Sequence, residues 1–245
     1  MDKSLIFDKL QKKSENLEII ENLYADDIFA NYYHSIVDQD ALLEDDIDEY
    51  KQFFDKKMAV LEVGSGTGRV FNPLFNEGYN IFGLEPAKEM AEHIAYEGRE
   101  RIYKLTLQEI EKFPLKDIEV IIIPATSVSL FSHEEFFDFL KKVKETQPNI
   151  KKIIFDFLKE EFFEATSGTI QATYVNNEKF YSVNFFDKAK ERVIYNLVSS
   201  QKIGVSVKYL YSYSVLEKIF ESLDLSLNLV RELDNYAMVE GVFHE

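Results

Sequence analysis

Three glycines alternate with small polar residues in the stretch "MAVLEVGSGTGRVF", which spans residues 58–71. Glycine is needed where the backbone takes a positive φ or where a ligand must approach the main chain closely. These glycines follow a short apolar run and precede a segment with helical spacing, as at the carboxyl edge of a parallel sheet. Open α/β sheets bind their ligands at that edge. We therefore expect the loop to hold a cofactor.

Two carboxylates flank this loop. Glu62 lies just before the first glycine, and Glu85 ends the next apolar run, "NIFGLEP". Glu85 follows the loop at close to the distance of about 20 residues at which an acid binds ribose hydroxyls. The glycine spacing, however, is one residue shorter than the G-x-G-x-x-G pattern of a pyrophosphate-binding turn. A carboxylate at Glu62 would oppose a phosphate, so the pattern favours a cation at this place.

The elements that would position these residues alternate along the chain. Short apolar runs predict strands, and the segments between them have helical spacing, which is typical of βαβ units and a parallel sheet. The capping-box spacing of Ser132 and Glu135 marks the start of one helix. Strands are expected at 58–63, 80–86, 101–107, 119–125, 151–158, 225–233 and 236–244, and helices at 69–78, 87–98, 132–148 and 214–224. The sequence predicts an α/β fold with a seven-stranded, mostly parallel sheet.

Two further segments frame this sheet. Apolar residues at helical spacing over 1–24, and an aromatic segment at 26–54, predict a helical lid over residues 1–50, ahead of a main domain at 51–245. Between about 167 and 213, four alternating segments rich in β-branched and aromatic residues predict an antiparallel β insertion after the fifth strand of the sheet.

The stretches "VLEVGSGTGR" and "GLEP" together resemble the class I S-adenosylmethionine-dependent methyltransferases, in particular those that act on small molecules. The resemblance covers roughly residues 50–160 and implies a Rossmann-like fold and S-adenosylmethionine as cofactor. It implies that Glu85 binds the ribose and that Pro86 flanks the adenine. The cofactor-binding positions that it implies are Glu62, Gly64, Ser65, Gly66, Gly68, Arg69, Glu85, Pro86, Glu109, Ile110 and Thr126.

The acceptor side is less defined by the sequence. In related enzymes, a segment before the core closes over the cofactor, and a tyrosine often lies near the methyl group, so the resemblance suggests Tyr33 as a catalytic residue. His133 is a second candidate, as a base near the loop that follows the fourth strand. Equally, each of these residues could have a purely structural role. The candidate substrate-binding residues are Tyr32, Tyr33, Ser127, Tyr174 and Tyr209.

Composition limits the partners. The net charge is −16 and no cysteine is present, which disfavours nucleic acid and anionic membranes and excludes disulfides and thiolate metal sites. We expect a cytoplasmic protein without a metal, a monomer or homodimer, that methylates N or O of a neutral or cationic small molecule. Two alternatives remain: a non-catalytic protein that binds S-adenosylmethionine or a partner, and an NAD-dependent oxidoreductase.

Overall fold

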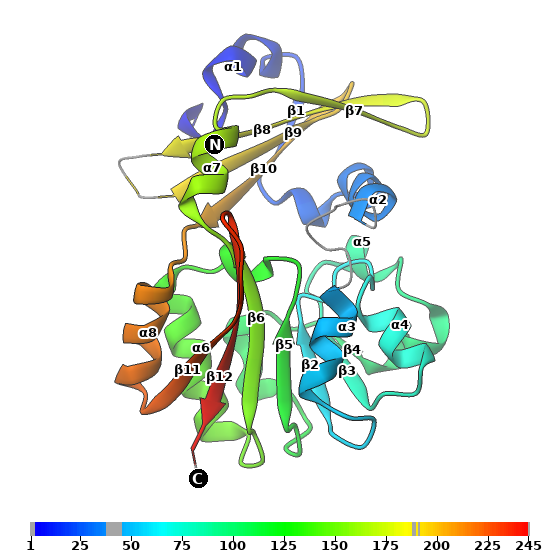
Figure 1. Cartoon of the computed structure of the whole chain (residues 1–245). Helices are drawn as coiled ribbons and strands as arrows, with labels where there is room; N and C mark the ends of the chain where they lie inside the picture. Colours follow the sequence, from blue (N-terminus) through cyan, green and yellow to red (C-terminus); the bar gives the residue numbers. More distant parts are fainter. Residues whose placement is uncertain (1–2, 38–45, 188–189, 191, 245) are drawn as a thin grey trace.

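The computed structural model describes residues 3–37, 46–187, 190 and 192–244, and these residues form two sheets, one above the other (Figure 1). The larger has seven strands in the order β11-β12-β6-β5-β2-β3-β4, and the smaller has five in the order β1-β10-β9-β8-β7. The strands are β1 (Glu18–Ile20), β2 (Val60–Val63), β3 (Ile81–Leu84), β4 (Ile102–Tyr103), β5 (Val120–Ile123), β6 (Lys152–Leu158), β7 (Gln171–Val175), β8 (Glu178–Asp187), β9 (Arg192–Val198), β10 (Lys202–Tyr209), β11 (Leu225–Glu232) and β12 (Tyr236–Phe243).

The α-helices lie around and between the sheets. They are α1 (Asp8–Ser14), α2 (Asp27–Ile36), α3 (Asp46–Tyr50), α4 (Phe71–Asn76), α5 (Lys88–Ala91), α6 (His133–Thr146), α7 (Glu160–Thr166) and α8 (Tyr213–Ser222). Short 3-10 helices include η2 (Leu23–Ala25), η6 (Tyr96–Arg101), η7 (Leu107–Lys112) and η8 (Ser127–Leu130). No helix in these described ranges has both the length and the apolar character needed to cross a membrane.

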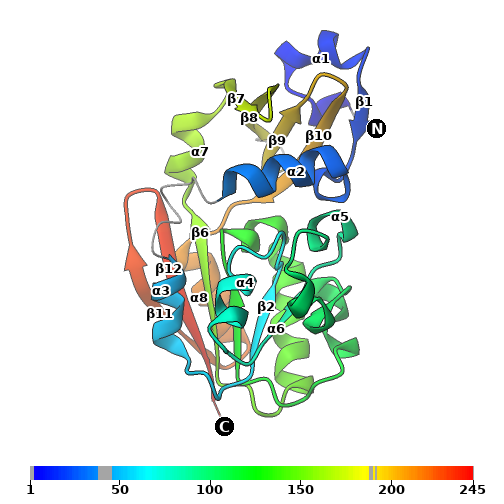
Figure 2. The ribbon, with the colours of Figure 1, turned by 90° about the vertical axis from the view of Figure 1, so that its right-hand side faces the viewer.

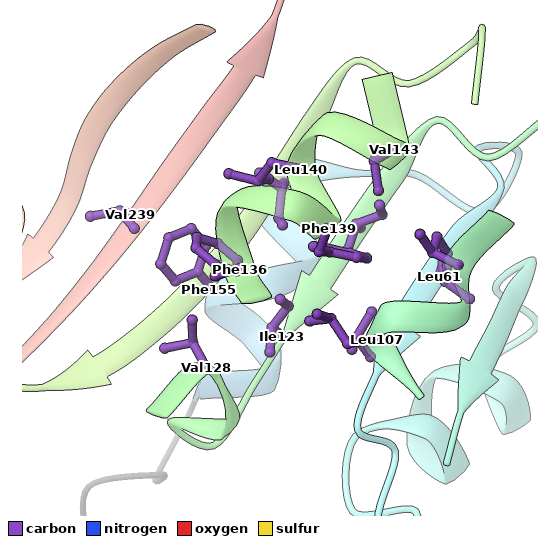
Figure 3. Packing of buried hydrophobic residues seen from close by; sticks show 14 of the residues in the cluster. Leu61, Leu107, Ile123, Val128, Phe136, Phe139, Leu140, Val143, Phe155 and Val239 are labelled. Atoms are coloured by element: carbon purple, nitrogen blue, oxygen red, sulfur yellow. The ribbon is translucent and has the colours of Figure 1, made fainter. Parts of the chain in front are cut away.

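The seven-stranded sheet confirms the predicted fold class. Strands β2 to β6 run parallel to one another, and β12 and β11 continue the sheet beyond β6 in antiparallel pairs. Every residue of β2 and β5 is buried, because helices cover both faces of the sheet. On one face, α6 packs Phe136 against Phe155 of β6, and Phe139 belongs to the same hydrophobic cluster (Figure 3). The other face is covered by α3 and α4, whose cluster includes Tyr50 and Phe71.

The five-stranded sheet confirms the predicted antiparallel insertion, which supplies β7 to β10, and β1 then pairs in parallel with β10. This sheet lies above the carboxyl ends of the parallel strands, and α2 lies between it and α5 (Figure 2). We call β1, η2, α2 and β7 to β10 the cover. The division of the chain at residue 50 stays a prediction, and the segment 38–45 just before it lies outside the described residues.

Two local predictions are wrong. The expected helix over residues 1–24 gives way to β1 at Glu18, because Ile19 and Ile20 complete the edge of the cover sheet beside β10. The expected helix at 87–98 ends after one turn at Ala91 and is followed by η6. There, the ring of Phe71 packs so close to Gly98 that a side chain would clash with it.

Candidate functional site

A cavity of about 640 Å³ lies between the carboxyl edge of the seven-stranded sheet and the cover. The glycine loop, the end of β3 and the turn after β5 form its floor, and α2 and β10 form its roof. Its lining includes Tyr24, Tyr33, Val63, Gly64, Gly66, Leu84, Glu85, Pro86, Ala87, Met90, Thr106, Leu107, Gln108, Thr126, Ser127, Ser129, Phe131, Leu158, Phe162, Asn184, Ser206, Lys208 and Tyr209.

The glycine loop turns back under the cavity. Gly64 and Gly66 have φ values of +76° and +54°, a backbone conformation that residues with a side chain rarely adopt. The N–H groups of Gly64 and Ser65 donate to the carbonyl of Leu84 at 2.9 and 3.0 Å, which ties the loop to the end of β3. Ser65 is buried beside Gly83, outside the lining, and Gly68 packs against the side chain of Asn72. The loop therefore exposes its backbone to the cavity.

Glu85 joins the loop to the cavity floor. Its carboxylate accepts hydrogen bonds from the N–H of Gly66 and the N–H of Ala87, both at 2.8 Å. Burial raises the pKa of Glu85, and these two backbone donors oppose that effect. Pro86 lies next to it in the lining. The structure thus brings together the two features, loop and strand-end acid, that carried the sequence prediction.

Buried acidic and basic side chains lie beneath the loop. Burial raises the pKa of Glu62 to about 8, against smaller opposing effects of Ser65 and Arg69. Arg69 forms a two-bond ion pair with Asp46 of α3, with N–O distances of 2.8 and 2.5 Å. Neither Glu62 nor Arg69 lines the cavity. Asp46 is not among the predicted site residues, because nothing in the sequence indicates that α3 reaches this loop.

The turn after β5 is held from below by Asp156. Ala125 and Thr126 both have a positive φ, at 57° and 56°. The N–H of Thr126 donates to Asp156 at 2.7 Å, and the hydroxyl of Tyr236 donates to the same carboxylate at 3.0 Å. Burial raises the pKa of Asp156 to about 7. Ser127 then lies about 3.6 Å from the place where Gly64 would carry a Cβ, so this turn and the glycine loop are in contact.

The cover contributes Tyr33 and Tyr209 to the lining. The ring of Tyr33 reaches to 3.9 Å from the place of a Cβ on Gly66, so it stands directly over the glycine loop. Tyr32, in contrast, is buried against Phe180 of β8, with ring centroids 4.6 Å apart. Tyr174 is 70% exposed on β7, away from the cavity. Of these tyrosines, the structure brings Tyr33 and Tyr209 to the cavity and leaves Tyr32 and Tyr174 outside it.

The predicted site residues Glu109, Ile110 and His133 also lie outside the lining of the cavity. Glu109 closes a capping box with Thr106 and forms an ion pair with Lys112, which lower its pKa to about 2. Ile110 is fully buried in the core, and Thr106 to Gln108 line the cavity instead. The spacing of Thr106 and Glu109 is itself a capping-box signal, which indicates a structural role for Glu109.

His133 lies at a different hollow, of about 1290 Å³, between the cover, α7 and the C-terminal strands. Its Nε2 is 2.7 Å from the carbonyl oxygen of Leu210, and its ring packs on Tyr211. It is the first residue of α6, directly after the cap Ser132. Across the residues that the structure describes, no group of three or more histidines, aspartates and glutamates could hold a metal ion.

Comparisons with known proteins agree with this geometry. Residues 61–146 match the family model described as a methyltransferase domain. An S-adenosylmethionine-dependent methyltransferase from Clostridium acetobutylicum is 14% identical with a TM-score of 0.66, over 89% of this chain and 98% of that one. The CcbJ methyltransferase from Streptomyces caelestis is 16% identical with a TM-score of 0.63, over 81% and 89%.

A third similar structure is CalS10 with S-adenosylmethionine bound, an amino pentose methyltransferase from Micromonospora echinaspora. It is 14% identical with a TM-score of 0.59, over 81% of this chain and 89% of that one. No curated protein sequence matches the chain. The glycine loop, the strand-end acid Glu85 and most of the turn-forming segments of the cavity floor lie within the matched residues. Residues 61–146 therefore match a methyltransferase domain, and the fold is that of S-adenosylmethionine-dependent methyltransferases.

Proposed function

We propose that this protein transfers the methyl group of S-adenosylmethionine to a nitrogen or oxygen atom of a small molecule. The observation that carries this proposal is the position of Glu85. Its buried carboxylate holds the N–H of Gly66 at one end of a cavity whose roof is a separate sheet. A volume of about 640 Å³ is within the usual range for a small-ligand site.

The residues present fit the cofactor. Glu85 can accept hydrogen bonds from two ribose hydroxyls, and Gly64 and Gly66 leave room for a ligand against the backbone. When bound, S-adenosylmethionine supplies a methyl group whose bond to sulfur breaks as the acceptor forms a new bond to carbon, while sulfur keeps the electron pair. The chain then has to orient the acceptor and exclude water.

We infer that Tyr33, Ser127 and Tyr209 do that work. Tyr33 covers the glycine loop from α2, and Ser127 contacts Gly64 from the turn after β5. Asp156 keeps this turn in its strained conformation through Thr126. We assign Tyr33 and Ser127 to the region around the methyl group and Tyr209 to the acceptor. We further propose that Thr106 to Gln108 take the adenine-side role that the sequence suggested for Glu109 and Ile110.

Calorimetry with S-adenosylmethionine tests the proposal. We expect the wild-type protein to bind, and Glu85→Ala to weaken binding by at least about 100-fold, because two hydrogen bonds to a charged group contribute about 1.5–3 kcal/mol each. Glu97→Ala is the matched control, since Glu97 is exposed on η6 and lies outside the lining. Absence of binding by the wild-type protein would end the proposal. Tight NADH binding in its place would support an oxidoreductase.

A further inference from the structure

A row of polar side chains crosses the cover sheet above the cavity. Asn184 of β8 pairs with Tyr195 of β9, and Tyr195 pairs with Ser206 of β10. Residues paired directly across antiparallel strands place their side chains on the same face. Asn184 and Ser206 both line the cavity, so this is the face that looks toward the glycine loop. The cover therefore presents a polar row to the acceptor side of the cavity.

Asn184 differs from the other two members of the row. The hydroxyl of Tyr195 interacts with Ser182, and Ser206 interacts with Tyr24. The Oδ1 atom of Asn184, in contrast, is buried and has no hydrogen-bond partner in the part of the chain that the structure describes. Leaving a buried acceptor without a donor costs free energy, so such atoms in native structures require an explanation. The main chain of Asn184 is fixed, because its carbonyl accepts from the N–H of Gly168 at 2.7 Å.

We propose that Asn184 binds the acceptor through an N–H group, and that the acceptor is a primary or secondary amine. This inference rests on the proposed function. An amide oxygen can only accept a hydrogen bond, so the group that satisfies it must be a donor. The described lining carries three carboxylates, Glu21, Glu85 and Glu135, and a single lysine, Lys208. This balance favours a neutral or cationic donor over an anionic one.

The lining also favours nitrogen over oxygen. An amine attacks with the lone pair of its neutral form, and one bound as an ammonium first loses a proton to water, whereas an alcohol requires a base to remove its proton during the reaction. Within the described lining there is no histidine. Glu85 is held by two backbone N–H groups, and Glu135 accepts from the N–H of Ser132 and from Gln108. Glu21 is exposed at the rim.

Two substitutions separate recognition by Asn184 from its structural role. Asn184→Leu removes the acceptor atom at similar size, and Asn184→Asp keeps an oxygen in its place. Asn228→Leu is the matched control, since Asn228 lies on β11 outside the lining. The probes are benzylamine, N-methylbenzylamine and cyclohexylamine, each compared with benzyl alcohol or cyclohexanol, in methylation assays and in calorimetric binding experiments.

We expect the wild-type protein to bind and methylate at least one of the amines and none of the alcohols. Asn184→Leu should weaken amine binding by about tenfold to a hundredfold, the effect of one hydrogen bond to a polar or charged donor. Asn184→Asp and Asn228→Leu should retain it, and all variants should bind S-adenosylmethionine as the wild type does.

Three results would overturn the inference: equal amine binding by Asn184→Leu and wild type, methylation of the alcohols, or no binding of any amine. Each of these results counts only if the protein tested still binds S-adenosylmethionine. Loss of that binding in the wild type would instead remove the proposed function itself, so the two failures are distinguishable.

Discussion

The two sheets differ in how their strands are obtained from the chain. Strands β2 to β6 of the seven-stranded sheet follow one another in regular βαβ units and are covered by helices on both faces. The cover takes four strands from one insertion and its fifth, β1, from near the N-terminus. The floor of the cavity, the proposed cofactor side, therefore depends on local sequence patterns and a large core, whereas its roof, the proposed acceptor side, depends on contacts between distant segments. This difference suggests that stability and acceptor choice can be altered separately.

The largest expected effect concerns ion pairs in the two regions. Arg69→Met leaves Asp46 buried without its partner and should lower the free energy of unfolding by about 3–5 kcal/mol. Arg192→Met in the cover removes a more exposed pair with Asp187 and should cost about 1 kcal/mol or less. Urea denaturation measures both. Equal losses of unfolding free energy in the two variants would contradict the difference between the two regions.

The second prediction concerns pH and the acid beneath the glycine loop. Glu62 keeps its proton up to about pH 8 in the folded protein, whereas the unfolded chain loses it near 4.5. The unfolded state thus binds fewer protons between these values, and stability should fall as pH rises from 4.5 to 8. Glu62→Gln should make the fall in the free energy of unfolding between pH 4.5 and 8 smaller by a few kcal/mol, since each pKa unit corresponds to about 1.4 kcal/mol. Urea unfolding at pH 5, 7 and 9 tests this prediction, with Glu97→Gln as the control. If the free energy of unfolding changes with pH equally in Glu62→Gln and in the wild type, the prediction is refuted.

Two glycine substitutions test whether each sheet can be destabilised without the other. A Cβ on Gly241 of β12 would lie 2.0 Å from the buried ring of Phe220, and a Cβ on Gly204 of β10 would lie 2.7 Å from Leu23 and Phe29. Each alanine variant should cost about 1–3 kcal/mol. We expect Gly241→Ala to lower the melting temperature of the whole domain. Gly204→Ala should loosen the cover and weaken acceptor binding, with S-adenosylmethionine binding retained; loss of both ligands would contradict this.

The smallest expected effects come from two tyrosines. Tyr236→Phe removes the hydrogen bond to Asp156 beneath the turn after β5 and should lower the free energy of unfolding by about 1 kcal/mol. Tyr174→Phe, on the exposed face of β7, should change it by less than about 0.5 kcal/mol. Differential scanning calorimetry of the two variants checks the difference.

The sequence predicts the seven-stranded sheet and the place of Glu85 because both depend on short-range patterns. Apolar runs, a glycine loop and the acid at the next strand end lie in the order that one βαβ unit requires. The same reasoning does not find Asp46 or Asp156. Asp156 lies in the apolar run of β6 with no local signal, and its partners Thr126 and Tyr236 are distant in sequence.

The acceptor side is less predictable for the same reason. Helical spacing over residues 1–24 does not reveal that Ile19 will pair with β10, since that pairing depends on residues near 203. Asn184 is unremarkable in sequence, and its place above the cavity follows from the register of β8 with β9. Tyr33 and Tyr209 reach the cavity while Tyr32 and Tyr174 do not, a distinction that depends on which face each side chain occupies.

The pairing of β1 with β10 has a consequence for biosynthesis. Glu18 to Ile20 are translated well before their partners Lys202 to Gly204. The same holds for Phe7, whose N–H donates to Asn196 at 2.9 Å. Until then, Ile6, Leu10 and Phe29 lack the strands that bury them. These apolar side chains therefore stay exposed on the nascent chain until β9 and β10 have been made.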